Sequence, residues 1–421
     1  MGQTETEAKA NAKVQEYIFL LKTGKYQSIE KRLDPTMSRM IDASKFQGFW
    51  EGLQMQYGDL LKTGETSVKT KDSLFVCLTP LQFEKTKLNF RLVLNQKLQI
   101  AGLFLEPMEV PYAPAAWVDP RLFFEVKKAV PLAAFPSEGV LTLPNVQEKV
   151  PVVIIIGGSG PTDKDLTMGP NKIYKDMAWG LGTQGIASYR YDKRTRAFGS
   201  KMGDPEKVTV KEEYLDDLQA IVDMLRNHEA IDSNSIYLLG HSEGGYLIPW
   251  FAQEIKGVHG FLIAAGNYHK MADMIEHQLL HLKKYTRSEA ERAGLIAILE
   301  RVPYAQNKLT LQSPKDSLPL GMSAAYLVHL NNKAPENYLA TLNGKPVLVL
   351  QGGRDYQVPT SEFDSWKAAL ASHKQVTFQL YHQLNHIFMS GEGVCLPAEY
   401  TEPGNVSKLF ILDIAAWVKE N

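Results

Sequence analysis

Short runs of apolar residues recur from Arg121 onward and are separated by longer amphipathic segments. Such runs are typical of strands buried on both faces, and the segments between them have the spacing of helices. The runs expected to form parallel strands are Val152–Ile156, Ile186–Tyr189, Ile236–Leu239, Phe261–Ala264, Val347–Leu350 and Val376–Leu380. Two earlier runs, Leu122–Val126 and Val140–Leu143, are expected to enter the sheet as antiparallel strands. This alternation predicts an α/β fold with a doubly wound, mostly parallel sheet.

The first part of the chain has a different pattern. Residues 11–62 have helical spacing, and we expect one helix to start with Ser44 as its N-cap and to include Leu60 and Leu61. Residues 65–105 then alternate as in a β-meander. We therefore predict a small α+β domain over residues 1–105 and a proline-rich linker over 106–120. Residues 121–421 would form the α/β domain.

One stretch of the α/β region lacks strand-like runs. Residues 267–344 have helical spacing throughout. Ligand sites of parallel sheets lie at the carboxyl ends of the strands, and insertions there cover them. We expect this stretch to be a helical lid over the site.

The residues Gly240-His241-Ser242-Glu243-Gly244 follow one of the predicted strands and precede a predicted helix. This is the G-x-S-x-G pattern in the context of strand, sharp turn and helix, where a serine hydroxyl is exposed on a strained turn. A serine attacks only if a base removes its proton, and the base is usually a histidine held by a carboxylate. Ser242 is therefore the candidate nucleophile.

The expected partners follow Ser242 in the order acid, then histidine. Asp355 lies just after the strand Val347–Leu350, and His386 lies in a loop after the last predicted strand. His382, at the end of that strand, is the competitor for the base. His241 is expected to pack on the turn. We predict the triad Ser242, Asp355 and His386.

An oxyanion hole requires two N–H groups. One is expected from Glu243, the residue after the nucleophile, and the other from the loop after strand Val152–Ile156. In that loop Ser159 is the first choice and Gly160 the near alternative. A phosphate-binding loop is disfavoured, because the G-x-G-x-x-G spacing is absent and Pro161 interrupts the turn.

Composition excludes several other classes of function. The chain has 421 residues and a formal net charge of −1, which argues against a nucleic-acid partner. No apolar run is long enough to predict a membrane span. Cys77 and Cys395 are expected to be free thiols. No signal peptide is recognisable at Met1, so we expect either a cytoplasmic protein or an exported one whose signal peptide has been removed.

Two further groups of residues are weaker candidates for a functional site. His277 and His281 are four residues apart, but no third ligand is apparent, so no metal and no cofactor are predicted. The charged run Asp192–Arg196 is expected to be a self-paired, solvated loop.

Taken together, the motifs resemble the α/β-hydrolase superfamily, especially bacterial serine esterases and related acyl-peptidases and thioesterases. The motifs are Gly158–Asp165, Arg190–Arg194, Gly240–Gly245, Gly352–Asp355 and Asn385-His386. The resemblance implies hydrolysis of carboxylic esters through an acyl-enzyme, with a small-molecule ester or acyl substrate. An aminopeptidase or acyl-peptidase and a thioesterase, on the same triad, are the alternatives. A non-catalytic binding module is the alternative of another class, and the N-terminal domain could form a homodimer.

Overall fold

The computed structural model describes residues 5–421 except residues 85, 109, 133 and 287. The chain folds into two compact units that divide between Val110 and Pro111. Each unit has its own hydrophobic core.

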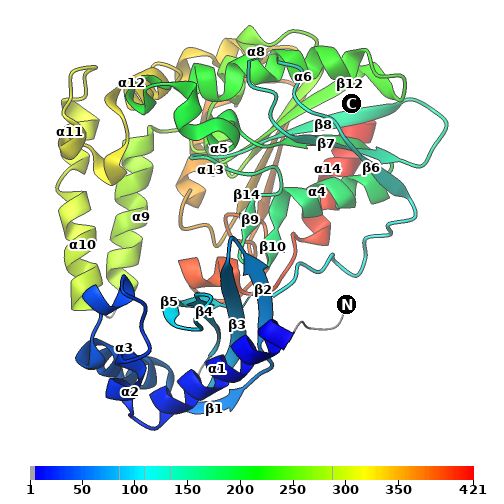
Figure 1. Ribbon diagram of the computed structural model, residues 1–421. Helices are drawn as coiled ribbons and strands as arrows, with labels where there is room; N and C mark the ends of the chain where they lie inside the picture. Colours follow the sequence, from blue (N-terminus) through cyan, green and yellow to red (C-terminus); the bar gives the residue numbers. More distant parts are fainter. Residues whose placement is uncertain (1–4, 85, 109, 133, 287) are drawn as a thin grey trace. The chain divides into compact units, whose positions relative to one another are not determined.

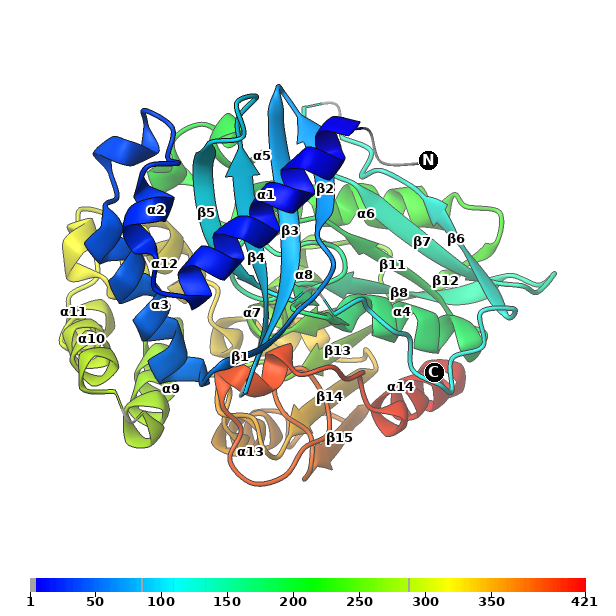
Figure 2. The same cartoon turned by 60° about the horizontal axis from the view of Figure 1, so that its bottom comes forward.

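The first unit consists of helices followed by an antiparallel sheet. Its elements are α1 (Glu5–Lys22), α2 (Tyr26–Glu30), α3 (Ala43–Tyr57), β1 (Leu60–Thr63), β2 (Ser67–Lys71), β3 (Leu74–Phe83), β4 (Lys87–Leu94) and β5 (Ile100–Pro107). The sheet order is β1-β3-β4-β5, with β2 also paired to β3. Figure 2 shows α1 lying across this sheet. The α+β class predicted for this part of the chain is confirmed.

The α3 helix differs from its predicted bounds at both ends. Its N-cap is Asp42, whose carboxylate accepts a backbone N–H of the first turn at 2.9 Å, so the prediction of Ser44 is wrong. The helix ends at Tyr57, and Leu60 and Leu61 lie in β1 instead of the helix. Leu60 is buried and Leu61 is exposed, as the two-residue period of a strand requires. Two adjacent leucines fit both patterns, which is why spacing alone extended the helix.

The second unit is built on a sheet of eight strands in the described part of the chain. Its order is β15-β14-β13-β12-β8-β11-β7-β6. The strands are β6 (Phe123–Lys127), β7 (Gly139–Pro144), β8 (Val150–Ile156), β11 (Ala187–Tyr191), β12 (Ile231–His241), β13 (Gly260–Ala264), β14 (Val347–Gly352) and β15 (Val376–Tyr381). The pairs from β15 to β11 are parallel, and β7 pairs antiparallel with both β11 and β6. This is the predicted mostly parallel sheet with an antiparallel entry.

Helices cover both faces of the sheet (Figure 1). Helices α4 (Ile173–Thr183) and α14 (Lys408–Glu420) pack on one face, and α6 (Asp216–Arg226), α8 (Ile248–Glu254) and α13 (Thr360–Ala369) pack on the other. Shorter elements are the hairpin β9 (Thr167–Met168) and β10 (Asn171–Lys172), α5 (Arg194–Phe198) and α7 (Glu243–Tyr246).

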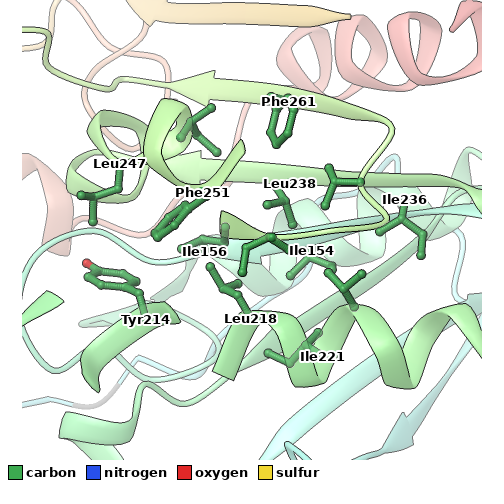
Figure 3. Packing of buried hydrophobic residues seen from close by; sticks show 14 of the residues in the cluster. Ile154, Ile156, Tyr214, Leu218, Ile221, Ile236, Leu238, Leu247, Phe251 and Phe261 are labelled. Atoms are coloured by element: carbon green, nitrogen blue, oxygen red, sulfur yellow. The ribbon is translucent and has the colours of Figure 1, made fainter. Parts of the chain in front are cut away.

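The strand β8 shows how the sheet is fixed between its helices. Ile154 and Ile156 point to the face covered by α6, where they pack with Leu218 (Figure 3). Val153 and Ile155 point to the opposite face, toward α4 and α14. A side chain of this size contributes about 1.5–3 kcal/mol when it is fully buried. The loops at the carboxyl end of the sheet therefore start from a rigid base.

The region between β13 and β14 is helical in the described residues. It contains α9 (Met271–Tyr285), α10 (Glu289–Leu299), α11 (Val302–Asn307) and α12 (Ala324–Asn331). The apolar spacing predicted this helical insertion.

Candidate active site

Ser242 lies on the turn between β12 and α7. Its φ of 56° and ψ of −122° are a conformation that residues with side chains rarely adopt. Its N–H donates to the Ala264 carbonyl of the neighbouring strand at 2.9 Å, which ties the turn to the sheet. A Cβ on Gly240 would collide with the Gly244 carbonyl oxygen, so the turn requires glycine by direct contact.

Asp355 and His386 lie in the loops after β14 and β15 and form a close pair. Asp355 Oδ2 lies 2.7 Å from His386 Nδ1, and both residues are buried. Asp355 Oδ1 accepts the N–H groups of Gln357 at 2.8 Å and Val358 at 2.9 Å. The fixed carboxylate orients the imidazole so that Nδ1–H donates to it and the Nε2 lone pair can accept a proton. The competitor His382 is exposed.

Ser242 and His386 line one cavity of about 170 Å³. The other lining residues are Gly158, Ser159, Thr162, Leu166, Met168, Tyr174, His241, Gln357 and Ile387. Within the described residues, neither the Ser242 hydroxyl nor His386 Nε2 has a hydrogen-bond partner. Bonds between a nucleophile and its base are often long without substrate and tighten when substrate binds. The arrangement therefore leaves the two groups open to a substrate between them.

The loop that follows β8 approaches Ser242 closely. A Cβ on Gly158 would lie 2.9 Å from Ser242 Cβ. The Ser159 N–H has no partner among the described residues, and Glu243, as the first residue of α7, has no acceptor for its N–H within the helix. Within the described residues, both predicted donors are thus without an acceptor and lie near Ser242. Gly160 lines a different cavity, of about 360 Å³.

His241 lies beneath the site and is bound on both ring nitrogens. The Gly158 N–H donates to the Tyr174 hydroxyl at 3.2 Å, and this hydroxyl lies 3.1 Å from His241 Nδ1. His241 Nε2 lies 3.0 Å from the His386 carbonyl oxygen. Since an N–H can only donate and a carbonyl can only accept, the proton of His241 is on Nε2. Burial, and then the neighbouring His386, lower the pKa of His241 to about 3.

A buried polar cluster lies on the other side of the loop after β8. It consists of Lys193, Glu213, Tyr214, Glu243 and Tyr326. Lys193 Nζ lies 3.5 Å from a Glu213 carboxylate oxygen and 2.5 Å from the Tyr214 hydroxyl. Burial lowers the pKa of Lys193 and raises the pKa of Glu243.

This cluster contradicts the expectation that the run Asp192–Arg196 is solvated and paired with itself. Lys193 and Arg194 are buried, and their acidic partners, Glu213 and Asp217, lie outside the run. Polar residues in sequence give no sign of burial when their partners are distant. The one available signal is that Lys193 follows β11, the neighbour of β8 in the sheet.

The inserted helices contact the site through two side chains. The Tyr326 hydroxyl of α12 lies 2.5 Å from a carboxylate oxygen of Glu213 and 2.5 Å from one of Glu243, and it donates its single proton to one of the two. Gln278 of α9 donates to the Gln357 carbonyl at 3.1 Å, and Gln357 lines the cavity. The insertion is thus attached to the residue that follows Ser242 and to a residue that lines the cavity.

His277 and His281 were considered as metal ligands. His281 has other partners, and the His277 side chain has no hydrogen bond among the described residues. The His281 ring stacks on Tyr356 and bonds to the Cys395 carbonyl at 3.0 Å. Within the described residues there is no cluster of three histidine, cysteine or acidic side chains that could hold a metal ion. Both cysteines, Cys77 and Cys395, are buried free thiols, as expected.

Comparison with known proteins identifies two family matches and a similar esterase. Residues 171–392 match the family described as "Serine aminopeptidase, S33", and residues 14–103 match a family described as a protein of unknown function (DUF3887). The chain is 31% identical over 380 residues to esterase EstD of Thermotoga maritima, which covers 90% of this chain and 88% of that protein. None of the helices in the described residues has the length and apolar character needed to span a membrane.

Solved structures with a similar course of the chain include two hydrolases. An esterase of the archaeon Pyrobaculum calidifontis is 15% identical, covers 70% of this chain and 85% of its own, and has a TM-score of 0.44. A puromycin-hydrolysing peptidase of Mycobacterium tuberculosis is 15% identical, covers 86% of this chain and 48% of its own, and has a TM-score of 0.45. The family match and the identity to the Thermotoga esterase show that this chain belongs to the S33 family of α/β-hydrolases and is a carboxylesterase-like enzyme.

Proposed function

We propose that the protein hydrolyses esters of short carboxylic acids through an acyl-enzyme on Ser242. The observation that carries this proposal is the 2.7 Å pair of Asp355 and His386, which shares a cavity with the hydroxyl of Ser242 on its strained turn. A serine, an imidazole and a carboxylate are the parts that acyl transfer to water requires.

In the first half-reaction, Ser242 Oγ attacks the ester carbonyl while His386 Nε2 takes its proton. Asp355 stabilises the imidazolium that forms, and the N–H groups of Glu243 and Ser159 bind the oxyanion. Collapse of the tetrahedral intermediate breaks the bond to the alcohol oxygen, which receives the proton from His386. One such oxyanion donor is worth about 3 kcal/mol of the barrier.

In the second half-reaction, water takes the place of the alcohol. His386 accepts a proton from the water as its oxygen attacks the acyl carbon. The same two N–H groups hold the second oxyanion. Collapse releases the carboxylic acid and returns the proton to Ser242 Oγ, which restores the enzyme.

The cavity supports a short acyl group. Its volume of about 170 Å³ is small compared with roughly 300–1,000 Å³ for common ligand pockets. Leu166, Met168 and Ile387 provide apolar walls. No carboxylate is present among the described residues that line it, so nothing there would bind the amine of a peptide's N-terminus. This favours an ester over an aminopeptidase substrate.

The test is labelling of the intact protein with a fluorophosphonate, read by mass spectrometry, with Ser242→Ala alongside. We expect one adduct, on Ser242, and a loss of kcat of about 10⁴ or more in the variant. Acetate and butyrate esters of p-nitrophenol should be turned over faster than the octanoate ester, aminoacyl anilides and acyl thioesters. Equal kcat in the Ser242→Ala variant would refute the mechanism, and preferred cleavage of anilides or thioesters would refute the substrate class.

A further inference from the structure

The loop after β8 is held from behind by a buried lysine. Lys193 Nζ lies 2.5 Å from the Gly158 carbonyl oxygen and 3.0 Å from the Gly160 carbonyl oxygen. The Tyr214 hydroxyl also lies 2.9 Å from the Gly158 oxygen, but it lies equally close to a carboxylate oxygen of Glu243. A hydroxyl has one proton to donate, whereas an ammonium has three. Lys193 is therefore the constant donor to this carbonyl.

The direction of the Gly158 carbonyl determines where the next N–H points. A trans peptide is planar, and its C=O and N–H point in opposite directions. Gly158 O faces Lys193, which does not line the Ser242 cavity, whereas Gly158 and Ser159 do line it. The N–H of Ser159 therefore points away from Lys193 and toward the cavity.

Lys193 and Tyr174 fix the two sides of the same residue. The Gly158 N–H donates to the Tyr174 hydroxyl at 3.2 Å, and the Gly158 carbonyl accepts from Lys193. With both groups bound, the peptide between Gly158 and Ser159 has little freedom to rotate. A rotation of this peptide would move its N–H out of the cavity.

We propose that Lys193 is a positioning residue for catalysis, which aims the Ser159 N–H at the oxyanion by holding the Gly158 carbonyl on the opposite side of the loop. This inference rests on the proposed function above. It assigns to Lys193 no contact with substrate.

The surroundings of Lys193 agree with a positioning role. Its side chain is 2% exposed, and Glu213, its ion-pair partner, is 3% exposed. Buried ion pairs commonly add little net stability over apolar residues of the same size, because desolvation offsets their attraction. The ammonium nevertheless makes hydrogen bonds to two carbonyls of one loop. Its main effect is thus expected on the geometry of that loop.

The experiment compares Lys193→Met with Arg194→Met in the full-length protein. Arg194 is also buried, but its Nη2 lies 2.5 Å from Asp217, and within the described residues its side chain makes no hydrogen bond to the loop after β8. For each variant, kcat and KM for p-nitrophenyl acetate, the inhibition constant of a trifluoromethyl ketone and the melting temperature are measured. The ketone forms a tetrahedral adduct and so reports on the oxyanion hole.

For Lys193→Met we expect kcat to fall about 100-fold, because this is the typical loss of kcat when one oxyanion donor is displaced. KM should be nearly unchanged. The inhibition constant of the ketone should rise by the same factor as kcat/KM falls. Arg194→Met should lower the melting temperature while kcat and the inhibition constant stay within about threefold of the parent, since the Arg194 guanidinium pairs with Asp216 and Asp217 of α6 and lies over the Phe135 ring. Equal losses of kcat in both variants, or a loss confined to melting temperature in Lys193→Met, would overturn the inference.

If Lys193→Met does not fold, Lys193→Gln decides the question. Glutamine keeps a polar side chain in the buried cluster, but it is one atom shorter than lysine and cannot hold both the Gly158 and the Gly160 carbonyl as Lys193 does. We expect a loss of kcat of about fivefold, as for one lost hydrogen bond, with a matching rise in the ketone's inhibition constant. Parent values for both constants would refute the inference. An active Ser242→Ala variant would refute the proposed function instead, so the two failures are distinguishable.

Discussion

Replacing Gly158 by alanine adds one methyl group where the proposed oxyanion loop approaches Ser242. The new Cβ would lie 2.9 Å from Ser242 Cβ and 3.4 Å from the His241 carbonyl oxygen. Carbon atoms in contact prefer about 3.5–4.0 Å, so the loop must retreat by at least about 0.6 Å. Neither neighbour can yield, because Ser242 is held by its turn and His241 by both ring nitrogens.

A retreat of this size is enough to lose one oxyanion donor. An N–H···O bond of about 2.9 Å would lengthen to about 3.5 Å, which is longer than the usual range of such hydrogen bonds in proteins. Losing one donor costs about 3 kcal/mol, so kcat should fall about 100-fold or more while KM changes little. The assay is steady-state hydrolysis of p-nitrophenyl acetate, with the melting temperature measured in parallel.

The matched control is Gly294→Ala in α10, where an added Cβ meets no atom within 4 Å. Alanine there should leave kcat unchanged and stabilise the helix by about 0.5–1 kcal/mol. A Gly158→Ala variant with the kcat of the parent would refute the assignment of this loop to the oxyanion hole. A variant that loses kcat only because it is unfolded at the assay temperature would be recognised by its melting curve.

Two further outcomes follow from the same geometry. Asp355→Asn keeps the shape of the site but presents a different hydrogen-bond pattern to His386, so kcat should fall by about 10⁴ with an unchanged fold; a loss of less than tenfold would contradict the role of Asp355. The second outcome concerns acid. Burial lowers the pKa of His241 to about 3 in the folded protein, whereas an unfolded chain has a histidine pKa of about 6.5. Between these values the unfolded state binds more protons, so the His241 contribution to stability is complete above pH 6.5 and is lost as pH falls toward 3, by at most about 5 kcal/mol. Urea unfolding at pH 7, 5.5 and 4.5 measures it, and a His241→Asn variant with the same pH dependence as the parent would show that another group is responsible.

Much of the catalytic unit follows from local patterns in the sequence. The strands of the sheet are buried on both faces, so their residues are apolar without interruption, and Val152–Ile156 is recognisable for this reason. The turn at Ser242 is recognisable in part because Gly240 is required by a contact within the turn, with the Gly244 carbonyl oxygen. A structural feature that depends only on near neighbours in the chain can be recognised from the sequence.

Features that depend on distant partners were not predictable in the same way. The cluster around Lys193 draws residues from the segment after β11, the helical turn before α6, α7 and α12, which only the order of the strands brings together. A run of charged residues fits a solvated loop unless its partners are known. The same limit applied to Leu61, because it lies in β1, a strand that is fixed by its pairing with β3.

The hydrogen bonds from the Gly158 N–H through Tyr174 and His241 to the His386 carbonyl join two loops that arise from different strands. Each bond has a fixed direction, because a donor stands at one end of the series and an acceptor at the other. A proton added to His241 Nδ1 would turn that acceptor into a donor, reverse the bond to Tyr174 and leave the proton of the Tyr174 hydroxyl without its acceptor. The loop that carries the proposed oxyanion donor and the loop that carries the proposed base would then be disturbed together. Acid inactivation of this enzyme would accordingly be a cooperative event in which both halves of the catalytic apparatus are lost in one transition.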